Sequence, residues 1–172
     1  KKIHRLRPDH VWRADKKIII RRISGGKKPL VCALDKNKYH SFASTNLLVL
    51  NDNFKDKYPY EFLSLLINSD LMNYFYSKSF SNASDLTVNI ATTFLEKLPL
   101  PLFTDSNKKK IQKIAKDYDK IEKYSHKLYL DPENTNLLNE VEEIENTVNK
   151  KIYDVYGLDN KEISVINESF VN

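Results

Sequence analysis

Residues 17–34 read KIIIRRISGGKKPLVCAL, two apolar runs separated by a polar segment that contains adjacent glycines. The first run holds three consecutive β-branched isoleucines, which favour a strand over a helix. Gly25 and Gly26 supply the positive φ that a tight turn requires. The pattern predicts strands over 17–23 and 30–34, joined by a hairpin turn.

Two more apolar runs follow this hairpin, and each begins after a polar cluster. Residues 39–43 and 46–50 both have the length and the flanking turn residues that are typical of short strands. Taken together with the hairpin, they predict a β-meander over 17–50.

The next segment changes from strand-like to helix-like patterning. Residues 59–77 predict a largely buried helix, because apolar side chains occupy most of its surface and Pro59 suits a first helical turn. A short strand over 86–90 and a helical turn over 91–98 follow. The Leu-Pro-Leu-Pro segment at 98–101 then ends regular structure.

The C-terminal third has a helical period. Apolar residues recur at spacings of three and four over 111–128 and again over 137–155, which predicts two amphipathic helices in an antiparallel hairpin. Gly157 suits the end of the second helix, and Asp159 and Glu162 have capping-box spacing for a final short helix.

These elements predict an α+β fold. A small antiparallel or mixed β-sheet packed with helices forms a first unit over 1–103. A C-terminal antiparallel helical hairpin and a short helix form a second unit over 104–172.

The charge is distributed unevenly along the chain. The net charge is +5, but residues 1–40 hold 13 basic and three acidic residues, or +10, and the remainder carries −5. All five arginines fall within the first 22 positions. Arginine suits forked contacts to phosphate and guanine, so this end predicts a surface for a polyanion such as DNA.

The glycine turn and its flanks are the candidate contacts to DNA. The turn matches neither a P-loop nor a dinucleotide fingerprint, and it leads into a strand rather than a helix. Phosphate contacts are expected from lysines and base-edge or close backbone contacts from Arg21 or Arg22, which point to opposite faces of a flat strand. The full set of candidates is Lys16, Lys17, Arg21, Arg22, Ser24, Gly25, Gly26, Lys27, Lys28, Lys36, Lys38 and Tyr39.

The sequence gives little support for catalysis or metal binding. The four histidines are scattered, and the single Cys32 lies in an apolar run that predicts a buried residue. Asp9, Asp15 and Lys17 resemble a nuclease pattern only superficially, because only five residues separate the first acid, Asp9, from the second half of the pattern, Asp15 to Lys17. We expect no metal site and no cofactor in this chain.

Several stretches resemble the TaqI-like C-terminal specificity domain of bacterial restriction-modification enzymes, which is related to type I specificity subunits. The resemblance depends on the order in which these stretches occur along the chain. They are KIIIRRISGG (17–26), VCALD (31–35), YHSFASTNLLVL (39–50), FLSLLINSDLMNYFY (62–76), LEKLPLP (95–101) and VNKKIYDVYGLDNKEISVINES (148–169).

The resemblance implies a target recognition domain over 1–103 that binds duplex DNA in sequence-specific fashion. Its parent would be an adenine-N6 DNA methyltransferase of type II, IIG-like, with S-adenosylmethionine as cofactor of the methyltransferase domain. The chain itself has neither the Asn/Asp-Pro-Pro-aromatic motif nor a glycine-rich S-adenosylmethionine loop. It begins at Lys1 rather than Met, and we expect a fragment without the catalytic domain.

Other functions remain open from the sequence. The helical hairpin is equally consistent with a protein-interaction module that recruits a partner subunit, and Asp9, Asp15 and Lys17 leave a stand-alone nuclease as a third hypothesis. No apolar run approaches the roughly 20 residues of a membrane span. A reducing, cytoplasmic location is expected, with duplex DNA and the methyltransferase domain of the parent as partners.

Overall fold

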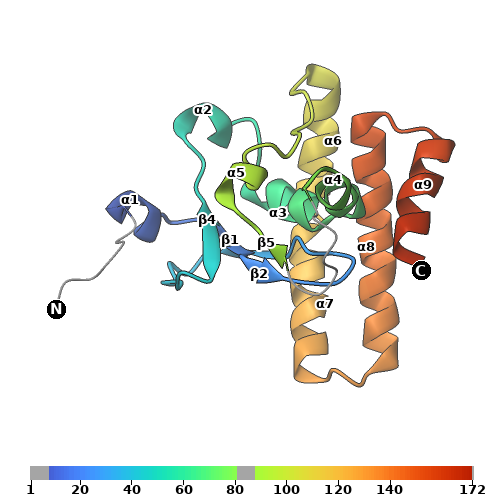
Figure 1. Cartoon of the computed structure of the whole chain (residues 1–172), viewed down its shortest axis with the longest axis horizontal. Helices are drawn as coiled ribbons and strands as arrows, with labels where there is room; N and C mark the ends of the chain where they lie inside the picture. The colour runs from blue at the N-terminus through green and yellow to red at the C-terminus, as the bar shows by residue number, and fades with distance from the viewer. Residues whose placement is uncertain (1–7, 81–87, 172) are drawn as a thin grey trace.

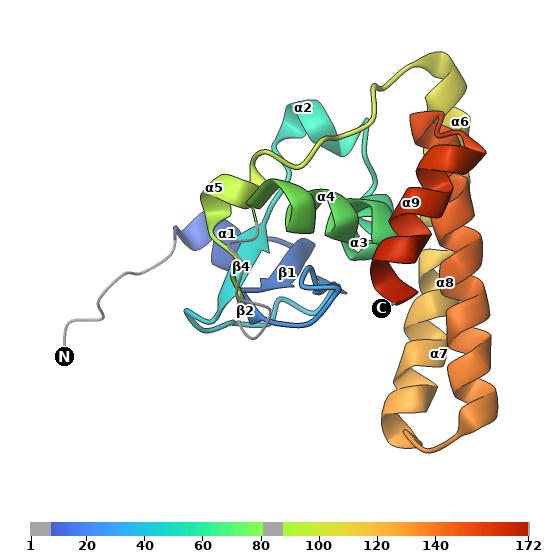
Figure 2. The same ribbon diagram turned by 45° about the vertical axis from the view of Figure 1, so that its right-hand side comes forward.

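The computed structural model describes residues 8–80 and 88–171 and has the α+β architecture predicted from the sequence. A small antiparallel sheet lies at one side of the molecule and long C-terminal helices lie at the other (Figure 1). Helices α3 (Tyr60–Asn68) and α4 (Asp70–Phe80) lie between them, as Figure 2 also shows.

The sheet is built around its first strand. Strand β1 (Lys17–Arg21) lies between β3 (Cys32–Asp35) and β4 (Thr45–Leu48), and both neighbours run antiparallel to it. Its isoleucines suit this central position because β-branched side chains pack well on a pleated surface. A second, two-stranded sheet pairs β2 (Ile23–Ser24) with β5 (Val88–Asn89).

The predicted meander is wrong in one respect. Residues 39–43 form no strand, and β4 pairs with β1 rather than with the preceding segment. Since β3 and β4 are parallel to each other on either side of β1, the connection 36–44 has to run back along the sheet and cross β1. The connection uses residues 39–43 to cover this distance, so they are not available to form the predicted strand.

The predicted helix over 59–77 is two helices. Ser69 has an extended backbone (ψ 156°) between α3 and α4. Its hydroxyl donates to the carbonyl of Leu66 and accepts from the amide of Met72, which satisfies groups at the end of one helix and the start of the next. The helical turn predicted over 91–98 is present as α5 (Thr92–Leu95), and two short helices that the sequence did not predict are α1 (Asp9–Trp12) and α2 (Asp52–Lys55).

The C-terminal helices confirm the predicted hairpin, with one extra break. Its first arm is divided into α6 (Asp105–Ala115) and α7 (Tyr118–Leu130), and its second arm is α8 (Thr135–Tyr156). Gly157 ends α8 with φ 71°. The capping box is present, since Asp159 and Glu162 each accept the other's backbone amide at 2.9 Å, and α9 (Asn160–Val171) follows.

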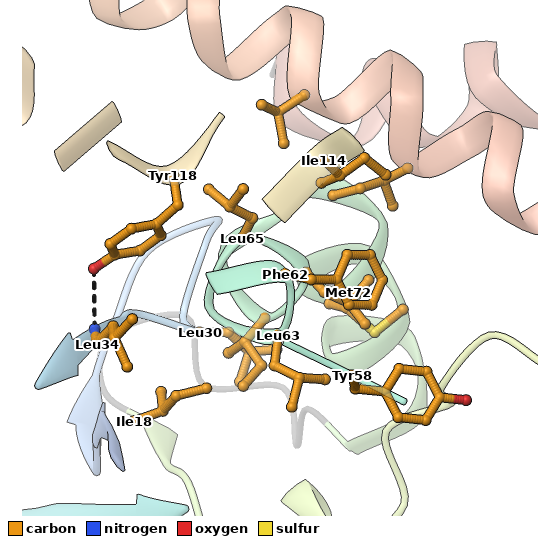
Figure 3. Close-up of a cluster of buried hydrophobic side chains, with 14 of the residues drawn as sticks. Ile18, Leu30, Leu34, Tyr58, Phe62, Leu63, Leu65, Met72, Ile114 and Tyr118 are labelled. Carbon is orange, nitrogen blue, oxygen red and sulfur yellow. Dashed lines mark hydrogen bonds between the residues drawn. The ribbon is translucent and has the colours of Figure 1, made fainter. Parts of the chain in front are cut away.

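A single hydrophobic core joins the sheet to the C-terminal helices. Ile18 and Leu34 from the sheet, Phe62 from α3, and Ile114 and Tyr118 from α6 and α7 belong to one buried cluster (Figure 3). The boundary predicted at residue 103 therefore divides the chain at a point where the two units share their core. Within the described residues, none of the helices has the length and apolar character to cross a bilayer.

Candidate nucleic-acid interface

Lys17 does not lie on the surface, which corrects its prediction as a phosphate contact. Its side chain is 0% exposed, and its ammonium lies 2.9 Å from the Asp35 carboxylate and 3.4 Å from the Trp12 carbonyl. Ile18 and Ile20 face the core with the helices, so Lys17 points to the opposite face of β1. The segment before β1 and the crossing connection meet over that face, because Trp12, whose carbonyl accepts from Lys17, packs against His40 with tilted rings 5.1 Å apart.

The glycine turn projects from the sheet toward the C-terminal helix. Gly26 has φ 78°, as expected for the turn, but Gly25 does not adopt a positive φ, and Ser24 is buried in β2. Lys27 donates to the carbonyl of Phe170 at 3.2 Å. Lys28 lies 2.5 Å from the Asp70 carboxylate and 5.3 Å from the centre of the Phe170 ring. Both lysines of the turn are thus held by helices α4 and α9.

The remaining candidate lysines also have acidic partners. Lys16 bonds Glu61 at 2.9 Å and Lys38 lies 2.7 Å from Asp15. Lys36 reaches two carboxylates of α7, Asp119 at 3.4 Å and Glu122 at 3.2 Å, and its ammonium lies 5.0 Å from the centre of the Tyr118 ring. Carboxylates of α3 and α7 therefore neutralise Lys16 and Lys36, and Lys38 is paired within the basic N-terminal segment itself.

Arg21 and Arg22 are the candidates that keep donors available. Arg21 ends β1 with an exposed side chain, and no ion pair within the described residues involves either guanidinium. The half-buried Arg22 donates from Nε to the Asn89 side chain at 3.2 Å and from Nη1 to the Ala43 carbonyl at 3.4 Å. Because a guanidinium carries five N–H donors, three remain for a ligand.

The two arginines lie beside the last part of the crossing connection. The backbone amide of Arg22 donates to the Ser44 carbonyl at 3.0 Å, and Arg21 is paired with Thr45 across the sheet. This region, which we call the arginine end, consists of Arg21, Arg22, Ile23, Phe42, Ala43 and Ser44. Tyr39 lies in the same connection and is 62% exposed.

Phe42 is the residue of this region that the sequence did not reveal. Its side chain is 86% exposed, in a segment over 39–43 that the sequence predicted as a short strand. The only available signal was its place between Ser41 and Ala43, since a polar and a small neighbour do not require a buried ring.

The residues of the nuclease hypothesis do not come together. Asp9 pairs with Arg13 at 3.5 Å, Asp15 with Lys38 and the buried Lys17 with Asp35. Within the part of the chain that the structure describes, no group of three or more metal-binding side chains is present. The arrangement is therefore that of three separate ion pairs.

An exposed Arg21 beside a half-buried Arg22 that keeps N–H donors available is typical of a domain that binds an anionic partner. The family comparison agrees with this class: residues 1–100 match the model of the TaqI-like C-terminal specificity domain. The chain belongs to this family, whose members determine DNA-sequence specificity and are not themselves catalytic. No curated protein matches the chain.

Proposed function

We propose that this chain recognises a specific duplex DNA sequence and holds an adenine-N6 methyltransferase active site over the target base. The parent enzyme would be a type II, IIG-like restriction-modification protein in the cytoplasm, with S-adenosylmethionine bound by its methyltransferase domain. The observation that carries the proposal is the pair of available guanidiniums at the arginine end in a chain of this family.

Within this proposal, the contacts divide into two kinds. Arg21 is exposed and suited to a base edge, while Arg22 is oriented by Asn89 and Ala43 and suited to a phosphate or a base near the backbone. The exposed lysine pairs contribute little to stability, so phosphates can replace their internal partners. Lys16, Lys27, Lys28, Lys36 and Lys38 are then secondary phosphate contacts, with Gly25 and Gly26 allowing close approach of the backbone.

The test is a titration of labelled duplexes, enriched from a random-sequence library, at two salt concentrations. Arg21→Ala and Arg22→Ala should each weaken binding about tenfold, the loss expected for one good base contact. The double variant Lys27→Glu/Lys28→Glu should weaken binding and make its dependence on log salt less steep. Lys110→Ala is the matched control, because Lys110 is paired with Asp154 on the C-terminal helices and should leave affinity unchanged. Unchanged binding by all three variants would refute the assignment.

A second function is favoured by the free end of the α7–α8 hairpin. Tyr129 and Leu130 near the end of α7 are 80% and 69% exposed, and Leu138 near the start of α8 is 44% exposed. An exposed apolar group of this kind suits a protein contact, here the methyltransferase domain of the parent chain. Tyr129→Ser/Leu130→Ser should then weaken binding to that isolated domain and leave DNA binding intact.

A further inference from the structure

The outer edge of β4 is an open strand edge. The Arg22 amide donates to the Ser44 carbonyl at 3.0 Å, so alternate residues of this segment bond toward β4. By this alternation Asn46 and Leu48 direct their backbone groups to β1, and the N–H and C=O of Leu47 point away from the sheet. Among the described residues neither group of Leu47 has a hydrogen-bond partner, whereas the corresponding amides of β3 are bonded by helix side chains.

A groove runs along this open edge. A cavity of about 660 Å³ lies beside β4 from Arg22 onward, and a second of about 260 Å³ continues past the end of the strand to Phe54. The two cavities share Leu48 and Leu95 in their walls and therefore adjoin. Residues 45–51 line them in succession, and as extended backbone these residues span about 20 Å. The groove thus has the length of a short extended chain rather than of a compact small molecule.

The polar groups of the groove select a peptide. An unpaired N–H and C=O on a strand edge match the backbone of a further strand. Glu96 is exposed and lies in the walls of both cavities, so its carboxylate disfavours the phosphates of a nucleic acid there. Arg22 lines the groove beside the start of β4 and keeps three N–H donors, which suit a carboxylate of the ligand.

We propose that the edge of β4 binds an extended peptide segment of a partner protein as an additional, antiparallel strand. The backbone of the segment pairs with Leu47, its apolar side chains enter the two cavities, and a carboxylate at its C-terminal end bonds Arg22. Antiparallel pairing is the more stable kind per residue, and it places the C-terminal end of the segment beside the start of β4. The inference goes beyond the proposed DNA binding and does not depend on it. Because Arg22 is also a proposed DNA contact, peptide and duplex would compete for this residue.

The experiment uses the full chain and a random octapeptide library with free C-termini, and the probe is the tightest binder that the library yields. Its backbone amides are N-methylated one at a time, which removes one donor from each peptide, and affinity is measured by fluorescence polarisation. The losses should recur at alternate positions and reach about tenfold at the residue opposite Leu47. Arg22→Ala should weaken binding about tenfold, but not for a probe whose acidic group is replaced by an amide.

A variant of the strand edge tests the same contact from the side of the protein. Leu47→Pro removes the outward N–H and no bond of the β1–β4 ladder, so it should weaken binding at least about tenfold with a melting temperature close to that of the wild type. Tyr129→Ser/Leu130→Ser, which changes an exposed apolar group on the α7–α8 hairpin, is the control and should bind the probe normally.

The N-methyl scan decides the outcome even if Leu47→Pro fails to fold, because it leaves the protein unchanged. Losses without a period of two would overturn the proposal, as would a library that yields no binder sensitive to Arg22→Ala. Duplex binding without peptide binding would refute this inference and leave the proposed function intact. Peptide binding without duplex binding would refute the proposed function alone.

Discussion

The outer edge of β3 and the arginine end, two regions of the same small sheet, differ in how their polar groups are bonded. At the outer edge of β3, the Cys32 amide donates to the Asn68 side chain at 2.8 Å and the Cys32 carbonyl accepts from it at 2.9 Å. The Leu34 amide donates to the Tyr118 hydroxyl at 3.2 Å (Figure 3). Side chains of α3 and α7 thus close an edge that would otherwise invite pairing with another strand.

Among the described residues, the arginine end makes fewer contacts of this kind, since Arg22 donates to the Asn89 side chain and to the Ala43 carbonyl. The Arg21 side chain is exposed, and three N–H donors of the half-buried Arg22 have no partner among the described residues. Positive charge in a sequence therefore does not by itself mark a ligand surface. Lys17 and Lys36 form ion pairs within the molecule, whereas the Arg21 side chain is exposed to solvent. The predictions below test whether this division between internal and external charge is correct.

The largest effect is expected at the buried ion pair. Lys17→Met leaves the Asp35 carboxylate without its partner at a site that is 5% exposed, and should lower the free energy of unfolding by about 3–5 kcal/mol. Denaturant titration followed by circular dichroism measures the loss. The double variant Lys17→Met/Asp35→Leu removes both charges and should recover most of the stability. A loss of similar size in the double variant would mean that the cost is one of packing and not of charge.

The same pair should make stability depend on acid. Burial alone would raise the pKa of Asp35, but hydrogen bonds from Lys17 and from the Asn37 amide outweigh it and hold the pKa below its ordinary value of 3.8. A carboxyl with a lowered pKa stabilises the fold above its unfolded pKa, and this stability is lost as pH falls through the folded value. Unfolding free energies measured from pH 6 downward should therefore fall more steeply below about pH 4 in wild type than in Lys17→Met/Asp35→Leu. Parallel curves would contradict this role for Asp35.

A smaller loss is expected where a single hydrogen bond closes the β3 edge. Tyr118→Phe keeps the ring, and with it the contact to the Lys36 ammonium, but leaves the buried Leu34 amide without an acceptor. We expect a loss of about 1–3 kcal/mol in the free energy of unfolding. Tyr124→Phe, in the same helix, is the matched control and should change stability by less than about 0.5 kcal/mol. Equal values for the two variants would show that the hydroxyl does not secure the edge.

The sequence predicted the local elements better than their pairing. The isoleucine run, Gly157 and the Asp159–Glu162 box each act through neighbours in the chain, and their strand, helix end and cap are present. The pairing of β4 with β1 depends on how a loop crosses the sheet, which period and propensity do not encode. The break at Ser69 was missed because its apolar surroundings match one continuous helix.

The candidate site was likewise predicted only in part, because contacts between distant residues decide which basic side chains are exposed. Residue type identified the basic segment, but only the fold shows that Lys17 lies beneath the crossing connection and that α9 contacts Lys27. Of the five arginines that suggested a polyanion surface, Arg5 and Arg7 lie outside the described residues, and Arg13 pairs with Asp9. The roles of Arg21 and Arg22 stay predictions until binding is measured.

The smallest effect is expected at the glycine turn. The Lys28 side chain is 46% exposed and its pair with Asp70 is accessible to water, so Lys28→Ala should cost less than about 1 kcal/mol. The same denaturant titration applies, with Lys55→Ala as control, because Lys55 is similarly exposed and paired with Asp52. A cost as large as that of Lys17→Met would mean that the turn is part of the structural interior. A small cost means that Lys28 can leave Asp70 at little expense, which is what a residue must do if it is to exchange an internal carboxylate for a DNA phosphate.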